Sequence, residues 1–226
     1  DLALEAFTSA KTLDQAASAL IKIIESHAAR LEEVAQKVSR MYSYEFKGLD
    51  FTLAPFPEDS KSIGKALETL GLEAFGLAGS LFASTFMTST LDKAEFKRTG
   101  FNGLMLPVLE DSGLAQRASE GILTVRDLLL FSSVCGAGLD VIPLPGDTTA
   151  EELTPILLDL AALALRLNKA LTARLMPIPG KKAGEMTEFD FAFFANSKIM
   201  PLESAPLKGI LLTDENVPIS SRKARD

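Results

Sequence analysis

The fold is decided by the stretch Gly138-Leu-Asp-Val-Ile-Pro143, a short apolar run that ends at a proline and leads into a polar loop. Similar runs occupy residues 48–55, 101–107 and 171–177. Proline cannot donate a hydrogen bond to a strand ladder and belongs at a strand end, so each run predicts a buried strand. A fifth, phenylalanine-rich strand is predicted around residues 189–200.

Helical patterns alternate with these runs. The longest begins at Leu13, where apolar residues recur every three or four positions after Thr12, which suits an N-cap. The predicted helices cover residues 13–43, 60–70, 78–92, 124–134 and 150–167, with a short helix after Asp111. Such apolar strands between helices favour the α/β class, with mostly parallel strands and covering helices.

Length and composition indicate a single α/β domain over residues 1–226, because 226 residues with 47% hydrophobic content can bury a continuous core. Within it we expect a long helical segment over residues 1–47, strand-helix repeats over 48–200 and an irregular tail over 201–226. The chain opens at Asp1 inside a helical pattern, which predicts that an N-terminal portion precedes it.

Charge and apolar patterning limit the expected partners. The net charge of −7 argues against nucleic acid, and the basic clusters at residues 181–182 and 221–225 are short. No apolar run reaches the roughly 20 residues that a membrane span needs, so no membrane partner is expected. The single cysteine, Cys135, excludes an internal disulfide, and we expect a cytoplasmic location.

Acidic residues follow the prolines at the ends of the predicted strands. Glu110 and Asp111 follow the second run, Asp147 follows the third, and Glu58 and Asp59 follow the first. If the strands are parallel neighbours, these carboxylates converge on one rim and are candidate catalytic groups or ligands for Mg²⁺ or Ca²⁺.

A structural alternative is favoured for these acids, because a polar residue after a strand commonly caps the next helix. Asp147 or Thr148 would then cap the helix that begins at Ala150. The spacing leaves both interpretations open.

Arg174 lies inside an otherwise apolar run and is costly to bury without a carboxylate partner, for which Asp140 and Asp50 are candidates. The pair is either structural or positions Arg174 to bind an anionic ligand. Asp140 is also a candidate catalytic residue, and Asp50 a candidate ligand contact.

The loops after the last two runs add further candidate ligand contacts. Lys181 and Lys182 lie in a glycine-containing turn that suits a phosphate or carboxylate, and Gly146 lies in the Pro-Gly-Asp turn. An exposed basic turn is the favoured alternative for the two lysines.

Cys135 is a candidate nucleophile because of its residue type. It follows the predicted helix over residues 124–134, however, and the negative end of a helix dipole disfavours a thiolate. Burial as a small hydrophobic residue is therefore favoured.

Four segments together resemble the uncharacterised pyruvate-formate-lyase-like proteins. They are Asp50–Glu58, Phe101–Asp111, Ser133–Asp147 and Thr172–Lys181. The resemblance implies half of a ten-stranded α/β barrel of the glycyl-radical-enzyme type, with this chain as the carboxyl-terminal half. It implies no particular activity.

A glycyl radical is not expected. The motif that carries such a radical is Arg-x-x-Gly followed by Tyr or Phe, whereas Arg98-Thr-Gly-Phe101 is one residue short and lies mid-chain. Two hypotheses remain: a non-radical barrel enzyme that acts on a small anionic metabolite, or a non-catalytic ligand-binding or structural protein. A homodimer or an N-terminal half is the expected partner of the exposed sheet edge.

Overall fold

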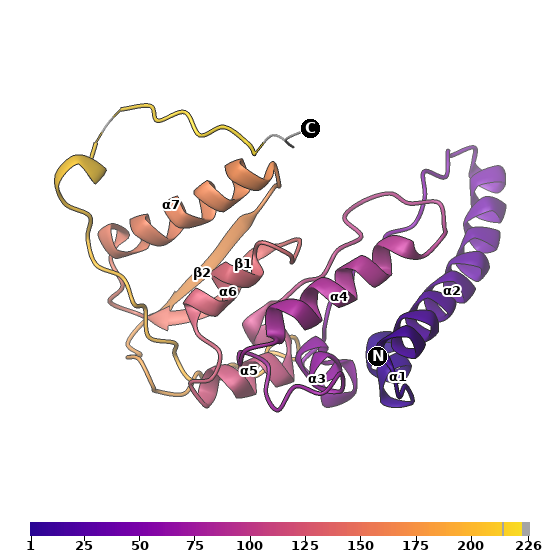
Figure 1. Cartoon of the computed structure of the whole chain (residues 1–226), viewed down its shortest axis with the longest axis horizontal. Helices are drawn as coiled ribbons and strands as arrows, with labels where there is room; N and C mark the ends of the chain where they lie inside the picture. Colours follow the sequence, from indigo (N-terminus) through magenta and orange to yellow (C-terminus); the bar gives the residue numbers. More distant parts are fainter. Residues whose placement is uncertain (214, 223–226) are drawn as a thin grey trace.

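The structure is a computed structural model that describes residues 1–213 and 215–222. Residues 223–225 of the predicted basic cluster lie outside the described residues. Figure 1 shows the amino-terminal helices at one end of the long axis and the sheet with its neighbouring helix at the other. The carboxyl-terminal segment runs around the sheet end of the molecule.

Helices account for most of the regular structure. The α-helices are α1 (Leu2–Thr8), α2 (Leu13–Tyr42), α3 (Ile63–Glu68), α4 (Ser80–Lys93), α5 (Ser112–Ser119), α6 (Val125–Phe131) and α7 (Ala150–Leu167). The short 3-10 helices are η1 (Asp59–Lys61), η2 (Val108–Glu110) and η3 (Gly209–Leu211).

The long predicted helix is confirmed as α2. Thr12 caps it by accepting a hydrogen bond from the backbone N–H of Gln15 at 3.2 Å, and Ser43 closes it in a left-handed conformation. Its buried residues lie on one face, at Ala16, Leu20, Ile24 and Ala28, and α2 packs there against α1 and α4.

The sheet consists of two parallel strands, β1 (Gly138–Pro145) and β2 (Thr172–Ile178). They correspond to the third and fourth runs of the sequence, but the predicted ends at Pro143 and Pro177 are wrong, because the paired strands continue to Pro145 and Ile178. α7 connects them and contributes Ile156 and Leu160 to the hydrophobic core. This strand-helix-strand unit is the α/β element that the sequence predicts.

The predicted strands at residues 48–55 and 101–107 are wrong as continuous strands. The two segments lie side by side in parallel, but they form only isolated bridges, at Leu49 with Arg98 and at Leu53 with Leu104. A turn interrupts the ladder where Asn102 has a φ of +47°.

The predicted fifth strand over residues 189–200 is also wrong. This segment forms one antiparallel bridge, between Met186 and Lys198, and otherwise folds as an irregular loop. Its phenylalanines contact one another instead of alternating across a sheet. β1 and β2 are the strands of the described chain, so the structure shows a small parallel sheet with helices and no ten-stranded barrel.

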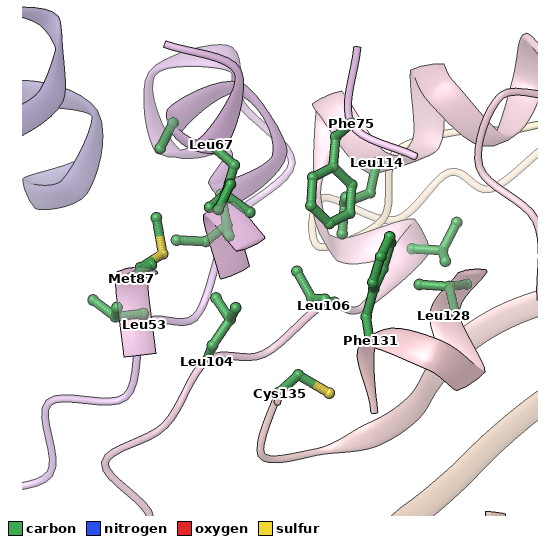
Figure 2. Packing of buried hydrophobic residues seen from close by; sticks show 14 of the residues in the cluster. Leu53, Leu67, Phe75, Met87, Leu104, Leu106, Leu114, Leu128, Phe131 and Cys135 are labelled. Atoms are coloured by element: carbon green, nitrogen blue, oxygen red, sulfur yellow. The ribbon is translucent and has the colours of Figure 1, made fainter. Parts of the chain in front are cut away.

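The core joins the interrupted segments to the regular elements. Leu53, Leu104 and Leu106 from the first two runs are buried in the same cluster as Phe131 and Cys135 (Figure 2). The backbone N–H of Gly136 donates to the carbonyl of Leu104 at 2.8 Å, which links the second run to the segment entering β1. The four runs therefore lie side by side in the order in which they occur along the chain, although only the third and fourth form strands.

Among the described residues, no helix combines the length and the apolar character required to cross a membrane.

Candidate functional site

Arg174 of β2 joins two carboxylates from different segments. Its Nε donates to Oδ1 of Asp140 on β1, and its Nη2 lies 3.1 Å from Oε1 of Glu110 in η2. The side chain of Asp140 is 2% exposed, that of Glu110 29% and that of Arg174 50%. The hydrogen bond that Arg174 donates to Asp140 raises the pKa of Arg174, so the guanidinium is charged throughout the physiological range.

A bulge in β1 places Asp140 against Arg174. Leu139 pairs with Ala173 and Ile142 with Leu175, so Asp140 and Val141 together stand opposite the single residue Arg174. Val141 has a φ of +48°, in the left-handed region that β-branched residues avoid. Such a conformation costs about 1–2 kcal/mol and is held here by the buried surroundings of the residue.

Asp140 also has an unsatisfied oxygen. Its Oδ2 is buried and has no hydrogen-bond partner in residues 1–213 and 215–222. A buried carboxylate oxygen without a donor is unusual and requires a structural or functional explanation. Asp140 is thus both a residue of the bulge and the residue with the unsatisfied oxygen.

Arg174 and Glu110 line a groove of about 390 Å³. The other residues lining it are aromatic or proline. We call it the Phe–Arg groove, and its members are Pro55, Phe56, Pro57, Glu110, Arg174, Phe191, Phe193 and Phe194. The ends of the first and second runs thus meet the middle of β2 at one side of the molecule, but of the acids predicted to converge on one rim only Glu110 lines the groove.

Asp111 lies next to Glu110 in sequence but has a different environment. It is fully buried, and its carboxylate accepts five hydrogen bonds at the amino-terminal ends of α3 and α5. The donors are Ser62 Oγ and the backbone N–H groups of Ile63, Gly64, Gly113 and Leu114. Burial raises the pKa of Asp111, and the five donors act in the opposite direction. Its oxygens are occupied in linking two helices.

Asp147 is exposed and does not cap α7. The cap is Thr149, whose Oγ1 accepts from the backbone N–H of Glu152 at 3.3 Å while the Glu152 carboxylate accepts from the backbone N–H of Thr149. The prediction that Asp147 or Thr148 forms the cap is therefore wrong. The capping box was visible in the sequence as Thr149 followed three residues later by Glu152.

Gly146 allows the loops after β1 and β2 to approach each other. Its backbone N–H donates to the carbonyl of Lys181 at 2.9 Å, and a β-carbon at this position would lie 2.2 Å from the carbonyl oxygen of Ile178. That N–H is already engaged, so the turn supports the loop contact instead of presenting a free amide.

Lys181 and Lys182 lie in the loop after β2. The Nζ of Lys181 lies 2.8 Å from Oε1 of Glu188, and Lys182 is exposed. Neither residue lines the Phe–Arg groove.

Cys135 is buried against the core, as the sequence favours (Figure 2). Burial raises the pKa of its thiol, and its Sγ lies 3.8 Å from the carbonyl oxygen of Gly138. A thiol in this environment is a weak nucleophile at neutral pH.

Asp50 organises the interrupted first two runs. Its carboxylate accepts hydrogen bonds from the hydroxyl and the N–H of Thr52 and from the backbone N–H groups of Phe101 and Asn102. Burial raises the pKa of Asp50, but these donors outweigh it and hold the pKa below its usual value. Arg174 pairs with Asp140 and not with Asp50.

The carboxylates considered for Mg²⁺ or Ca²⁺ do not form a cluster. Within the described parts of the chain, no three histidine, cysteine or acidic side chains are arranged to hold a metal ion. Glu58 and Asp59 form ion pairs with Lys61 and Lys65. Of the predicted candidates, the structure brings together Glu110, Asp140 and Arg174.

The phenylalanines of the groove were missed as site residues. Their sequence signal, Phe189-Asp-Phe-Ala-Phe-Phe194, resembles a strand because aromatic residues favour sheets. The asparagine that follows it, Asn196, indicated a loop instead.

A family model described as "Uncharacterised ACR (DUF711)" matches residues 1–197. The chain is 33% identical over 189 residues to a UPF0210 protein of Lactobacillus delbrueckii subsp. bulgaricus, covering 82% of this chain and 42% of the relative. It is 36% identical over 177 residues to a UPF0210 protein of Methanosarcina barkeri, covering 76% and 39%. A UPF0210 protein of Methanocaldococcus jannaschii is 35% identical over 162 residues, covering 70% and 35%. The chain thus spans about two fifths of the length of these relatives.

Proposed function

Because the chain belongs to the DUF711 family of uncharacterised proteins, we propose a function from its site: the Phe–Arg groove binds a small anionic metabolite as part of a non-radical barrel enzyme. Arg174 contacts the anion, Asp140 positions Arg174, and Glu110 is the candidate proton carrier. The proposal is restricted to these three because Asp111, Cys135, Gly146 and Asp50 have structural contacts that account for them.

The observation that carries this proposal is the strained bulge that holds Asp140 against a half-exposed arginine. A guanidinium has five N–H donors, and the contacts with Asp140 and Glu110 use Nε and Nη2. A carboxylate ligand would accept hydrogen bonds from Nη1 and, once Glu110 is displaced, from Nη2. Strain that persists in a buried backbone is typical of binding and catalytic sites.

Charge determines how an anion would enter. Arg174, Asp140 and Glu110 together carry one more negative than positive charge, so the cluster as it stands repels an anion. Glu110 is 29% exposed and pairs with only one nitrogen of Arg174, whereas Asp140 is buried. We therefore propose that the ligand displaces Glu110 from Nη2 and leaves the Asp140 contact intact.

We also propose that β1 and β2 belong to a larger parallel barrel, as the resemblance to pyruvate-formate-lyase-like proteins implies. In this proposal the chain corresponds to a carboxyl-terminal half, completed by an N-terminal half or by a second copy in a homodimer. The relatives are more than twice as long as the aligned regions, and β2 forms the edge of the sheet. A cytoplasmic location is part of the same proposal.

A non-catalytic ligand-binding or structural role is the second candidate. The full use of Asp111 in helix capping favours it, because the most deeply buried of the candidate acids has no free oxygen for chemistry. Turnover of a bound metabolite distinguishes the two candidates.

Binding of acetate to the full chain, followed by NMR chemical-shift titration, tests the proposal. Arg174→Leu is expected to abolish the shifts, and Glu110→Gln to strengthen binding because it removes the competing carboxylate. Arg126→Leu is the matched control, since that arginine forms an exposed ion pair with Glu203. Unchanged binding in Arg174→Leu, or weaker binding in Glu110→Gln, would contradict the proposal.

A further inference from the structure

The walls of the Phe–Arg groove are aromatic and come from two distant segments. Phe56 follows the first run, whereas Phe191, Phe193 and Phe194 lie in the irregular loop before Met200. Phe191 is 52% exposed and Phe193 56% exposed. Large apolar side chains that gather at a groove, instead of being scattered singly, indicate a surface that becomes covered.

The rings form a connected cluster. Phe56 meets Phe193 at a centroid distance of 5.6 Å and an interplanar angle of 84°, and Phe191 meets Phe194 at 5.2 Å and 89°. Phe191 also lies 5.3 Å from Phe193. Edge-to-face contacts of this kind are favourable and restrict ring rotation. The aromatic wall is thus largely formed before a ligand enters.

Backbone contacts hold the loop in place. The N–H of Ala195 donates to the carbonyl of Leu109 at 2.7 Å, directly beside Glu110 in the chain. Oδ1 of Asn196 accepts from the N–H of Phe189 at 2.7 Å and from the hydroxyl of Thr187 at 2.9 Å. The aromatic loop is therefore fixed against η2, the element that also carries the carboxylate paired with Arg174.

We propose that the groove selects small carboxylates that carry an aromatic or bulky apolar group. The carboxylate lies on Arg174 and the apolar group lies among Phe56, Phe191 and Phe193. A volume of about 390 Å³ suits a ligand of this size, and the walls present few polar groups to a phosphorylated or polyhydroxylated metabolite. This inference rests on the proposed function, because it assumes that Arg174 receives the anion.

Comparing phenylacetate with acetate on the full chain tests the selection. Wild type is expected to bind phenylacetate at least 10-fold more tightly than acetate. Phe193→Ala is expected to remove most of this difference, because it weakens the binding of phenylacetate far more than the binding of acetate. Phe82→Ala, at another exposed phenylalanine on α4 (63% exposed), is the matched control and is expected to change neither affinity.

The outcomes separate this inference from the function on which it rests. Equal affinities for phenylacetate and acetate, both lost in Arg174→Leu, would overturn the aromatic selection and keep the anion site. Binding that survives in Arg174→Leu would overturn the anion site. Tighter binding of phenethylamine than of phenylacetate would overturn both, since the groove would then select a cation. Phe193→Leu, which keeps an apolar side chain but removes the ring, repeats the test if the alanine variant does not fold.

Discussion

Asp111 and Asp140 are two buried carboxylates that differ in how many hydrogen bonds they accept. Asp111 accepts five hydrogen bonds and links the starts of α3 and α5. Asp140 binds Arg174 through one oxygen, and its other oxygen has no donor in the part of the chain that the structure describes. Counted over the whole residue, both are 1% exposed or less. Burial alone therefore does not distinguish the two acids, whereas the number of donors at each oxygen does.

The largest expected effect comes from removing the fully satisfied carboxylate. Asp111→Ala leaves four buried backbone N–H groups and one hydroxyl without their acceptor, so we expect a loss of about 3–5 kcal/mol in the free energy of unfolding. Urea denaturation measures it. Asp59→Ala, an exposed aspartate beside the same helix, is the control. A loss below about 1 kcal/mol would show that Asp111 does not hold the two helices together.

Asp140→Asn probes the other buried carboxylate with a nearly isosteric side chain. We expect a smaller loss, about 1–2 kcal/mol, because the half-exposed Arg174 regains water and still contacts Glu110. Acetate binding is expected to fall with it, since Arg174 loses the partner that positions it. The comparison fails if this variant loses as much stability as Asp111→Ala while binding is unaffected. Glu203→Gln, in an exposed ion pair, is the control.

Substitutions at Asp147 and Thr149 are expected to have smaller effects on stability, which again depend on the hydrogen bonds that each side chain accepts. Thr149→Ala removes the cap of α7 and is expected to cost about 1 kcal/mol. Asp147→Ala, at an exposed carboxylate, is expected to change stability by less than about 0.5 kcal/mol. Thermal unfolding of both variants measures these changes. A larger loss of stability in Asp147→Ala than in Thr149→Ala would identify Asp147 as the cap.

Asp50 gives the smallest effect, and that effect disappears in acid. Its folded-state pKa is depressed by its donors, so its contribution to stability is fully present above the unfolded pKa of about 3.9 and is lost as the pH falls through the lower folded value. Asp50→Asn is expected to lower the free energy of unfolding at neutral pH and to flatten the stability profile below about pH 4, so that the two proteins converge in acid. An identical acid limb in both proteins would contradict this.

The sequence predicted the elements whose signals are local. α2 and α7 have strong apolar periodicity and side-chain caps, and both begin at the expected residues, Leu13 and Ala150. The sequence predicts β1 and β2 because each contains an uninterrupted apolar run that leads to a proline. The interrupted runs were harder, because the turn at Asn102 depends on contacts with Asp50 from about 50 residues away.

The sequence predicts only part of the candidate site, because the rest depends on contacts between distant segments. The charge of Arg174 in an apolar run required a carboxylate, and one of the two named, Asp140, is the partner. Nothing in the local pattern distinguished Asp111 from Glu110, since their roles depend on where helices α3 and α5 begin in space. The aromatic wall was hidden because an exposed phenylalanine loop and a buried strand have similar compositions.

The backbone at Val141 has a consequence for how this site would respond to random substitution. Glycine there would relieve about 1–2 kcal/mol of conformational strain and lose about 1.5–3 kcal/mol of buried side chain, so the two changes nearly cancel. A library sorted only for folded protein would retain such a variant as neutral. Sorting for ligand capture would reject it, because the aspartate beside it would no longer be held at a single angle.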